Sequence, residues 1–332
     1  MHLLDEPLIR RAMSLGEFDL IAKYFTRRVT RAALGVGDDC ALFSTSPGMQ
    51  LAVSSDMLVE GRHFLPTVAP DRLGHKALAV NLSDLAACGA RPIGFTLALA
   101  MPRVDETFLA GFARGLLALA DMHECELIGG DTTQGPLNLC ITVFGELPAG
   151  QALLRSGARA GDELYVSGTL GDARAALEVF RGNLAVDGAA FETLRRAMEQ
   201  PVPRVALGQA LRGVATGAID VSDGLLGDLG HILARSQVGA TLEVDALPRS
   251  VVLRSLPAAL QRQFTLAGGD DYELVFSAPP DRADAVADAA YAAGVAVTRI
   301  GRIESEPGLR LVDANGAAVA NRYASFDHFK SS

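Results

Sequence analysis

Six short acidic motifs divide this chain and limit the structures that it can form. They are Gly37-Asp38-Asp39, Ser54-Ser55-Asp56, Ser83-Asp84, Gly129-Gly130-Asp131, Asp220-Val221-Ser222-Asp223 and Gly268-Gly269-Asp270-Asp271. Each lies beside glycine or serine, and most lie where an apolar run ends. A carboxylate there packs poorly, but it can bind a hard cation such as Mg²⁺, which commonly bridges protein carboxylates to substrate phosphates. The motifs therefore indicate an enzyme that handles phosphate through bound metal.

The apolar runs between the motifs predict alternating strands and helices in the first half of the chain. Residues 51–55 are apolar and β-branched and end in Asp56, which predicts a strand with its acid at the carboxyl end. Residues 71–88 have helical periodicity, and Gly89 followed by Pro92 ends that helix. The other expected elements are a helix over 16–25, a strand over 93–101, a helix over 106–119 and a strand over 137–147.

The segment Pro148-Ala149-Gly150 favours a loop and is the best candidate for a domain boundary. A length of 332 residues suits two domains. We therefore expect one domain over residues 1–149 and another over 150–332, in a mixed α/β (α+β) fold class. The second domain is expected to contain strands over 163–167, 274–277, 298–303 and 308–313 and helices over 172–180, 205–211, 225–234 and 283–293.

Composition argues against several classes of protein. Hydrophobic residues make up 49% of the chain and charged residues 21%, which indicates a globular protein rather than a disordered one. A formal net charge of -9 argues against nucleic acid as a partner. No apolar stretch reaches the roughly 18 residues of a membrane span, and the N-terminus lacks a signal-peptide core. Together with four cysteines that form no CxxC motif, these features predict a cytoplasmic protein with reduced thiols and no membrane partner.

The familiar nucleotide-binding motifs are missing from the sequence. Glycine is never followed by lysine, so there is no Walker A sequence. Gly35-Val36-Gly37 has no third glycine at position 40, so the dinucleotide fingerprint also fails. Glycine-lined loops together with metal are the remaining means of holding a nucleotide.

Taken singly, most of the acidic motifs have a structural alternative, which is a turn or a helix cap. Asp84 lies inside the 71–88 helix pattern with Asn81 one turn earlier, and Lys76 is an alternative ion-pair partner for it. Ser222 and Asp223 precede a helix and are expected to cap it, while a phosphate or metal is also favoured at such a helix start.

Two further residues have equally plain alternatives. His63 follows Glu60-Gly61-Arg62 and suits either an exposed loop or a binding site. Arg155 suits either the surface or a contact between its guanidinium and a phosphate.

Together, the motifs resemble those of the thiamine-monophosphate kinases, within the superfamily of aminoimidazole ribonucleotide synthetase-like ATP-dependent enzymes. The resemblance follows the order of the family over essentially the whole chain. The matching stretches are GVGDDCAL (35–42), VSSDMLVEGRHF (53–64), HKALAVNLSDLAACGA (75–90), LIGGDTTQGPL (127–137), RSGARAGDELYVSG (155–168), AIDVSDGLLGDLGHI (218–232), GGDDYEL (268–274) and FDHF (326–329).

The resemblance implies a two-domain fold whose N-terminal sheet joins that of a twin in a homodimer. The C-terminal α/β domain would close the cleft for nucleotide and substrate. The implied reaction is phosphorylation of thiamine monophosphate to thiamine diphosphate by direct transfer from ATP, which is the final step of thiamine diphosphate biosynthesis. The implied cofactor is Mg²⁺, as several ions, with K⁺ as a further candidate.

The resemblance also assigns residues by matching position. Metal ligands would be Asp39, Ser54, Ser55, Asp56, Asp84, Asp131, Asp220 and Asp223. ATP would be contacted through Gly130, Asp131, Arg155 and Ser222. Thiamine monophosphate would be contacted through His63, Asp270 and Phe326, although the family often carries Glu where this chain has Asp270. Catalysis is expected to depend most on Asp39, Asp56, Asp131 and Asp220.

Three competing functions remain open at this stage. Two are enzymes of the same superfamily, aminoimidazole ribonucleotide synthetase and selenophosphate synthetase. The second calls for a reactive Cys or selenocysteine near a glycine-rich N-terminus, whereas the first cysteine here is Cys40, inside an acidic motif. The third is a non-catalytic sensor that binds Mg-nucleotide.

Overall fold

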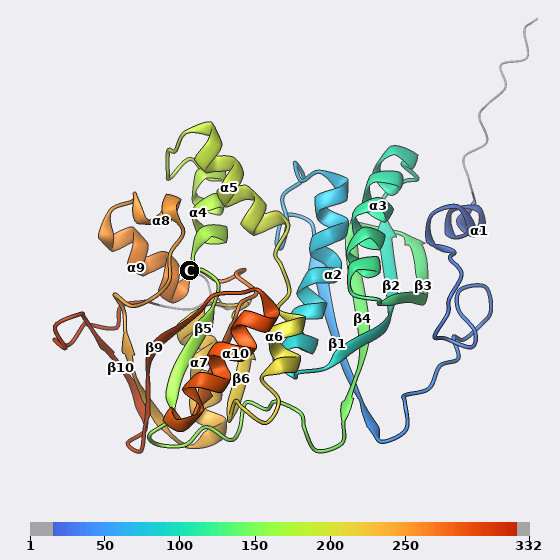
Figure 1. Ribbon diagram of the computed structural model, residues 1–332. Helices are drawn as coiled ribbons and strands as arrows, with labels where there is room; N and C mark the ends of the chain where they lie inside the picture. The colour runs from blue at the N-terminus through green and yellow to red at the C-terminus, as the bar shows by residue number, and fades with distance from the viewer. Residues whose placement is uncertain (1–15, 324–332) are drawn as a thin grey trace, which may run out of the picture.

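The computed structural model describes residues 16–323, which contain two β-sheets, one from each half of the chain (Figure 1). The short helical segments α1 (Glu17–Leu20) and η1 (Ile21–Phe25) come first. The first sheet has four strands in the order β1 (Met49–Val59), β4 (Asn138–Pro148), β2 (Arg91–Met101) and β3 (Glu126–Gln134). Its pairs are antiparallel except for β2 with β3. Helices α2 (Pro70–Ala87) and α3 (Glu106–Met122) cover one face of this sheet.

The second sheet has six strands, and helices cover both of its faces. The strand order is β10 (Gly308–Val312), β7 (Gly239–Glu243), β9 (Val297–Glu304), β5 (Glu163–Ser167), β8 (Leu274–Ala278) and β6 (Gly217–Asp220). Only β10 and β7 pair in parallel. Helix α7 (Leu225–Ser236) packs on one face, while α6 (Val205–Ala210) and α10 (Ala283–Ala293) pack on the other. Alternate residues of β5 follow this division, with Leu164 toward α7 and Tyr165 toward α6.

A smaller helical cluster adjoins the second sheet and has its own core. It consists of α4 (Asp172–Phe180), α5 (Gly188–Glu199), α8 (Val251–Arg254) and α9 (Ala258–Ala267). Ala176, Leu194, Leu253 and Phe264 are buried where these helices meet. The short η2 segment (Pro280–Arg282) leads into α10.

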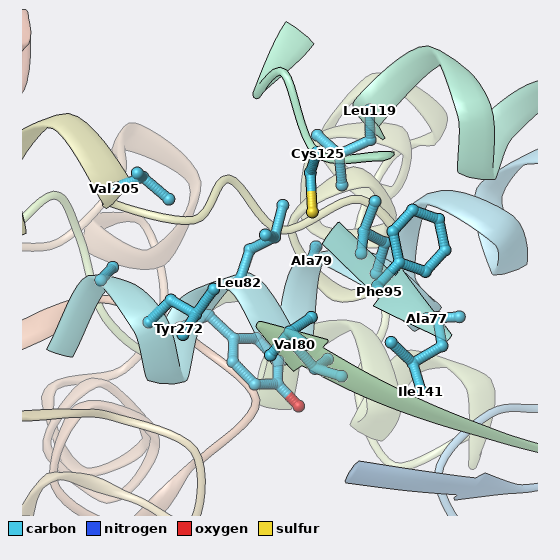
Figure 2. Close-up of a cluster of buried hydrophobic side chains, with 14 of the residues drawn as sticks. Ala77, Ala79, Val80, Leu82, Phe95, Leu119, Cys125, Ile141, Val205 and Tyr272 are labelled. Atoms are coloured by element: carbon cyan, nitrogen blue, oxygen red, sulfur yellow. The ribbon is translucent and has the colours of Figure 1, made fainter. Parts of the chain in front are cut away.

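Helix α2 packs against both halves of the molecule at once. Figure 2 shows Phe95 and Ile141 of the first sheet on one side of α2, with Val205 and Tyr272 of the second half on the other. All four side chains belong to one continuous apolar core. The core thus crosses from one half of the chain to the other through a single helix.

Close contact between α2 and α6 depends on a glycine. A Cβ atom added to Gly208 in α6 would lie 1.9 Å from the carbonyl oxygen of Ala86 in α2, a distance that real atoms do not reach. Because only a hydrogen atom fits there, the two helices approach closely enough to bury the apolar residues between them.

The mixed α/β fold class predicted from the sequence is confirmed, as are most of the long elements. Helix α2 and strands β2, β4 and β5 agree with their predicted ranges to within a few residues. The predicted end of the first strand was wrong, since β1 continues to Val59 and Asp56 lies inside it. The elements that the sequence did not predict are β3, β6, β7, α5, α8, α9 and the short η2 segment.

Among residues 16–323, none of the helices has the length and apolar character that crossing a membrane requires.

Candidate active site

Helix α2 faces strand β1 with polar side chains in the middle of an otherwise apolar contact. The Ser54 Oγ donates a hydrogen bond to Asp84 Oδ2 at 2.5 Å. The backbone N–H of Asp56 donates to Asn81 Oδ1 at 3.0 Å. Since side chains alternate along a strand, Ser54 and Asp56 share the face of β1 that lies against α2. The carboxylates of Asp56 and Asp84 are therefore neighbours.

Asp220 reaches the same place from the second half of the chain. It ends β6, its side chain is buried, and its Oδ2 accepts a hydrogen bond from Ser83 Oγ at 2.7 Å. Ser83 directly precedes Asp84, so α2 connects the carboxylates of the two halves. Asp223, three residues beyond Asp220, lies close enough to Asp56 for its charge to raise the Asp56 pKa.

We call this group of carboxylates the acidic cluster; its members are Asp56, Asp84, Asp220 and Asp223. Their charges repel one another. Burial, followed by the charges of Asp84 and Asp223, raises the pKa of Asp56 to about 6. Burial and then the charge of Asp84 raise the pKa of Asp220. Arg155 supplies positive charge here: burial raises the pKa of Asp84, but the guanidinium of Arg155 opposes that rise. A cation bound among these groups would relieve the repulsion.

The acidic cluster has the donor chemistry of a magnesium site that a ligand completes. Its potential ligands are carboxylate and hydroxyl oxygens, which hard cations prefer. Within the described part of the chain, no three His, Cys, Asp or Glu side chains are grouped closely enough to hold a metal by themselves. Mg²⁺ usually binds one or two carboxylates and takes its other ligands from water and phosphate. The residues present therefore fit Mg²⁺ held jointly by protein and nucleotide.

Two predicted metal ligands, Ser55 and Asp131, have side chains on the other face of the first sheet. The Ser55 Oγ lies 3.0 Å from Thr142 Oγ1, away from α2. In strand register, Asp131 aligns with Ala98, Ala98 with Cys140, and Cys140 with Met57. Because paired residues point to the same side of a sheet, Asp131 and the exposed Met57 side chain lie on the same face, which points away from α2. We call it the uncovered face, because no helix of residues 16–323 packs on it, although Phe43 contacts Phe144 there. The structure does not bring the Ser55 and Asp131 side chains to the acidic cluster.

Asp39 lies on an exposed loop that two glutamates attach to the first sheet. Glu126 accepts backbone hydrogen bonds from residues 30, 31 and 32 at 2.6, 2.9 and 3.0 Å. Glu146 accepts one from Ser46 at 3.0 Å. Between these anchors Asp39 is exposed, and no hydrogen bond or ion pair within residues 16–323 joins it to the acidic cluster.

The loop that carries Asp270 is fixed to α2 by an ion pair. The Lys76 Nζ lies 2.5 Å from Asp270 Oδ2 and also donates to the carbonyl oxygen of Met198 at 2.9 Å. Asp270 has a φ of 63°, in the left-handed region that few side chains adopt. The alternative of a Lys76–Asp84 ion pair is therefore wrong, because Lys76 is directed at Asp270 and Asp84 accepts from Ser54 instead.

Tyr272 is a site residue that the sequence analysis missed. Its ring is buried, and burial followed by the charges of Asp270 and Asp56 raises the pKa of its hydroxyl. Its φ of 52° is also left-handed. The sequence feature that could have identified it is its place in the GGDDYEL stretch, directly after two acidic residues.

The expected cap of α7 by Ser222 or Asp223 is also wrong. The N-cap residue is Gly224, which has no side chain that could accept a hydrogen bond from the helix. Instead, Asp228 in the first turn reaches back and accepts hydrogen bonds from the N–H groups of Ser222, Asp223 and Gly224, each at 3.1 Å. The N–H donors of the turn just before this helix are thus satisfied by the protein itself.

The structure places two of the three remaining predicted contact residues. His63 lies in the loop after β1, where its Nδ1 accepts the Val59 N–H at 3.0 Å. Gly130 lies on β3, at the opposite edge of the first sheet from β1. Phe326 lies outside the described residues.

Comparison with known proteins covers nearly the whole chain. Residues 37–147 match the AIR synthase related protein, N-terminal domain, and residues 159–314 match the corresponding C-terminal domain. A thiamine-monophosphate kinase from Salmonella typhimurium is 46% identical over 96% of this chain and 99% of its own length. One from Haemophilus influenzae is 44% identical over 96% of this chain and its full length.

Solved structures agree with these sequence matches. The crystal structure of thiamine-monophosphate kinase from Stenotrophomonas maltophilia K279a is 47% identical, with a TM-score of 0.81 over 87% of this chain and 92% of that one. AaThiL complexed with AMPPCP and TMP is 28% identical, with a TM-score of 0.76 over 86% and 89% of the two chains. Identity above 40% over almost the full length shows that this chain belongs to the thiamine-monophosphate kinase family.

Proposed function

We propose that this chain transfers the γ-phosphoryl group of ATP to thiamine monophosphate, giving ADP and thiamine diphosphate, with Mg²⁺ as cofactor. The observation that carries the proposal is the acidic cluster at the junction of the two halves, in a chain 46% identical to a thiamine-monophosphate kinase. The relative bound to AMPPCP and TMP, an ATP analogue and a phosphate acceptor, supports the pairing of these two substrates.

The chemistry needs alignment and charge neutralisation more than proton transfer. A phosphate oxygen of thiamine monophosphate is already a nucleophile at neutral pH, so no strong general base is required. That oxygen forms a bond to the γ-phosphorus while the bond from the γ-phosphorus to the β–γ bridging oxygen breaks, and ADP leaves. Arg155 would offset the charge that otherwise keeps two anions apart.

Within the acidic cluster, Asp56, Asp84, Asp220 and Asp223 would hold several Mg²⁺ ions, with one or two carboxylates to each ion and Ser54 beside them. The bound ions would neutralise the phosphate charge. We also propose Asp39 and Asp131 as metal ligands, at positions apart from the acidic cluster. Ser55 is the proposed ligand with the least support, because its side chain faces away from α2. We retain Asp39, Asp56, Asp131 and Asp220 as the acids on which turnover depends.

The two substrates would be held by different segments. For ATP we propose Gly130, Asp131, Arg155 and Ser222. For thiamine monophosphate we propose His63, Asp270 and Phe326. Of these residues, Asp270 has the best-defined position for a substrate contact, because Lys76 fixes one of its oxygens while its side chain remains 35% exposed.

The uncovered face of the first sheet supports the proposed homodimer. On β1, Leu51, Val53, Met57 and Val59 all point to this face and are exposed. A row of apolar side chains on an edge strand is a surface that a second copy can cover. We also propose that residues 1–149 form the dimerisation domain, that 150–332 close the cleft, and that the enzyme is cytoplasmic.

Release of ADP from Mg-ATP tests the function against its competitors. The acceptors to compare are thiamine monophosphate, thiamine, selenide and formylglycinamidine ribonucleotide, each with and without K⁺. Release that requires thiamine monophosphate, with thiamine diphosphate as the second product, is the expected result. Release with another acceptor would identify a different member of the superfamily, and Mg-nucleotide binding without release would indicate a sensor.

A further inference from the structure

Asp228 makes an unusual set of contacts for a residue inside a helix. It lies in the first turn of α7, and its side chain is 3% exposed. One of its oxygens, Oδ2, accepts hydrogen bonds from three consecutive backbone N–H groups, those of Ser222, Asp223 and Gly224, each at 3.1 Å. Because three consecutive N–H groups converge on one oxygen atom, this single side chain fixes the path of the turn.

The position of Asp228 changes how the helix start can be used. Backbone N–H groups at a helix N-terminus commonly bind phosphate. Here the N–H groups of the three residues just before the helix are bonded instead to the protein's own Asp228 carboxyl group. The turn therefore keeps one conformation without a ligand, and its side chains, rather than its N–H groups, remain for nucleotide and metal.

The same turn also supports the loop proposed to contact the substrate. The Asp270 N–H donates to the Ser222 carbonyl oxygen at 2.7 Å, and the Tyr272 N–H donates to that of Val221 at 2.9 Å. At Gly269, which has a φ of 70°, an added Cβ atom would lie 2.7 Å from the Ser222 oxygen. The two segments are thus in direct contact, and a shift of the turn would displace Asp270 as well.

We infer that Asp228 is a positioning residue, which holds the 222–224 turn so that Ser222 and Asp223 meet the Mg-nucleotide. It touches neither nucleotide nor metal and acts through the three N–H groups. This inference rests on the proposed function for the identity of the nucleotide. Outer-shell residues of this kind typically change metal affinity or activity by about 10–100-fold when they are replaced.

The first test is Asp228→Asn, which preserves size and weakens all three hydrogen bonds. In the metal-free protein, amide hydrogen exchange at residues 222–224 is expected to quicken about tenfold. The Mg²⁺ concentration for half-maximal binding of AMPPCP, measured by calorimetry, is expected to rise about tenfold. Asp228→Ala removes the acceptor and is expected to have a larger effect in both measurements.

The matched control is Asp105→Asn, since Asp105 also caps a helix and accepts the Phe108 N–H at 3.0 Å, but on α3. It is expected to lower the melting temperature without changing exchange at 222–224 or the Mg²⁺ requirement. Wild-type exchange and Mg²⁺ dependence in Asp228→Asn would overturn the inference, as would equal effects from Asp105→Asn. Wild-type protein that binds Mg-AMPPCP yet fails to phosphorylate thiamine monophosphate would instead count against the proposed function.

Discussion

The ammonium group of Lys76 lies 2.5 Å from Oδ2 of Asp270, although the two residues are 194 positions apart in the sequence. Lys76 is 3% exposed, whereas the Asp270 side chain is 35% exposed. The buried partner thus belongs to α2 and the accessible partner to the loop before β8. This ion pair joins the first half of the chain to the loop that we propose for substrate binding.

Replacing Lys76 by Met keeps most of the apolar stem and removes the charge. Asp270 then loses the partner that fixes its orientation, so the KM for thiamine monophosphate is expected to rise about tenfold, equivalent to about 1.4 kcal/mol. The KM for ATP should change much less. Steady-state kinetics with each substrate varied in turn measures both.

Lys23→Met is the matched control, because Lys23 also pairs with a carboxylate, Glu106, but at an exposed site on α3. It should leave both KM values unchanged. If Lys76→Met has the same KM for thiamine monophosphate as the wild type, the orientation of Asp270 does not matter for substrate binding.

Asp220→Asn should separate stability from activity. The Asn oxygen can still accept the Ser83 hydrogen bond, and a buried charge near Asp84 is removed. In Mg²⁺-free buffer the melting temperature is expected to rise by about 2 °C, while turnover falls roughly a hundredfold.

Differential scanning calorimetry and an ADP-release assay check the two effects of Asp220→Asn. The exposed Asp288 on α10 provides the control, and Asp288→Asn should change neither quantity. A lower melting temperature for Asp220→Asn would show that the acidic cluster stabilises the fold, contrary to our expectation.

Glu146 should make stability depend on acid pH. Burial alone would raise its pKa, but the Ser46 N–H and the guanidinium groups of Arg31 and Arg91 lower it to about 2. An ordinary glutamate in the unfolded chain titrates near 4.5. The stabilisation of the fold by ionised Glu146 is therefore complete above pH 4.5 and is lost as the pH falls from there toward 2.

Urea unfolding from pH 7 to 3 measures this effect against Glu146→Gln. At pH 7 the variant is expected to be less stable by about 2 kcal/mol, after allowance for screening of the partly exposed Arg91. The difference should shrink as the pH falls below 4.5. Glu306→Gln, at a side chain that is 82% exposed, should show no such dependence. A constant difference for Glu146→Gln over this range would contradict the prediction.

Met57→Asp tests the proposed homodimer. Met57 is 54% exposed on the uncovered face of β1, so a charge there opposes burial against a second copy. Sedimentation velocity is expected to show a dimer for the wild type and a monomer for the variant. Val251→Asp, at a side chain that is 76% exposed on α8, should remain dimeric. A monomeric wild type would remove the proposal outright.

Local sequence patterns predicted α2 well and β1 incompletely, for a physical reason. An apolar face and a terminating Gly89 identify a helix without any knowledge of its partners. Strand β1 was expected to end at Asp56 because the apolar and β-branched run of residues 51–55 ends there. The structure resolves this, since Asp56 faces the polar part of α2 while Met57 and Val59 point outward.

The sequence identified the acids of the site but not their grouping. Asp56, Asp84 and Asp220 meet because Ser54, Asn81 and Ser83 bridge strands to α2, and such long-range contacts leave no local pattern. The separation of Ser55 and Asp131 from that group depends on strand alternation and register. Likewise, a cap at residues 222 and 223 is the usual expectation before a helix, and only the folded chain reveals that Asp228 accepts the N–H groups of this turn instead.

The placement of α2 in the apolar contacts of both halves has a consequence for how this protein folds. A fragment that ended near residue 149 would expose the side of α2 that contacts Val205 and Tyr272, and the complementary fragment would lack that helix. Neither half can act as an autonomous folding unit, so thermal unfolding should occur as one cooperative event despite the two sheets. Because each half contributes to the interior of the other, we expect that a half taken from a relative would fit only with its own partner half.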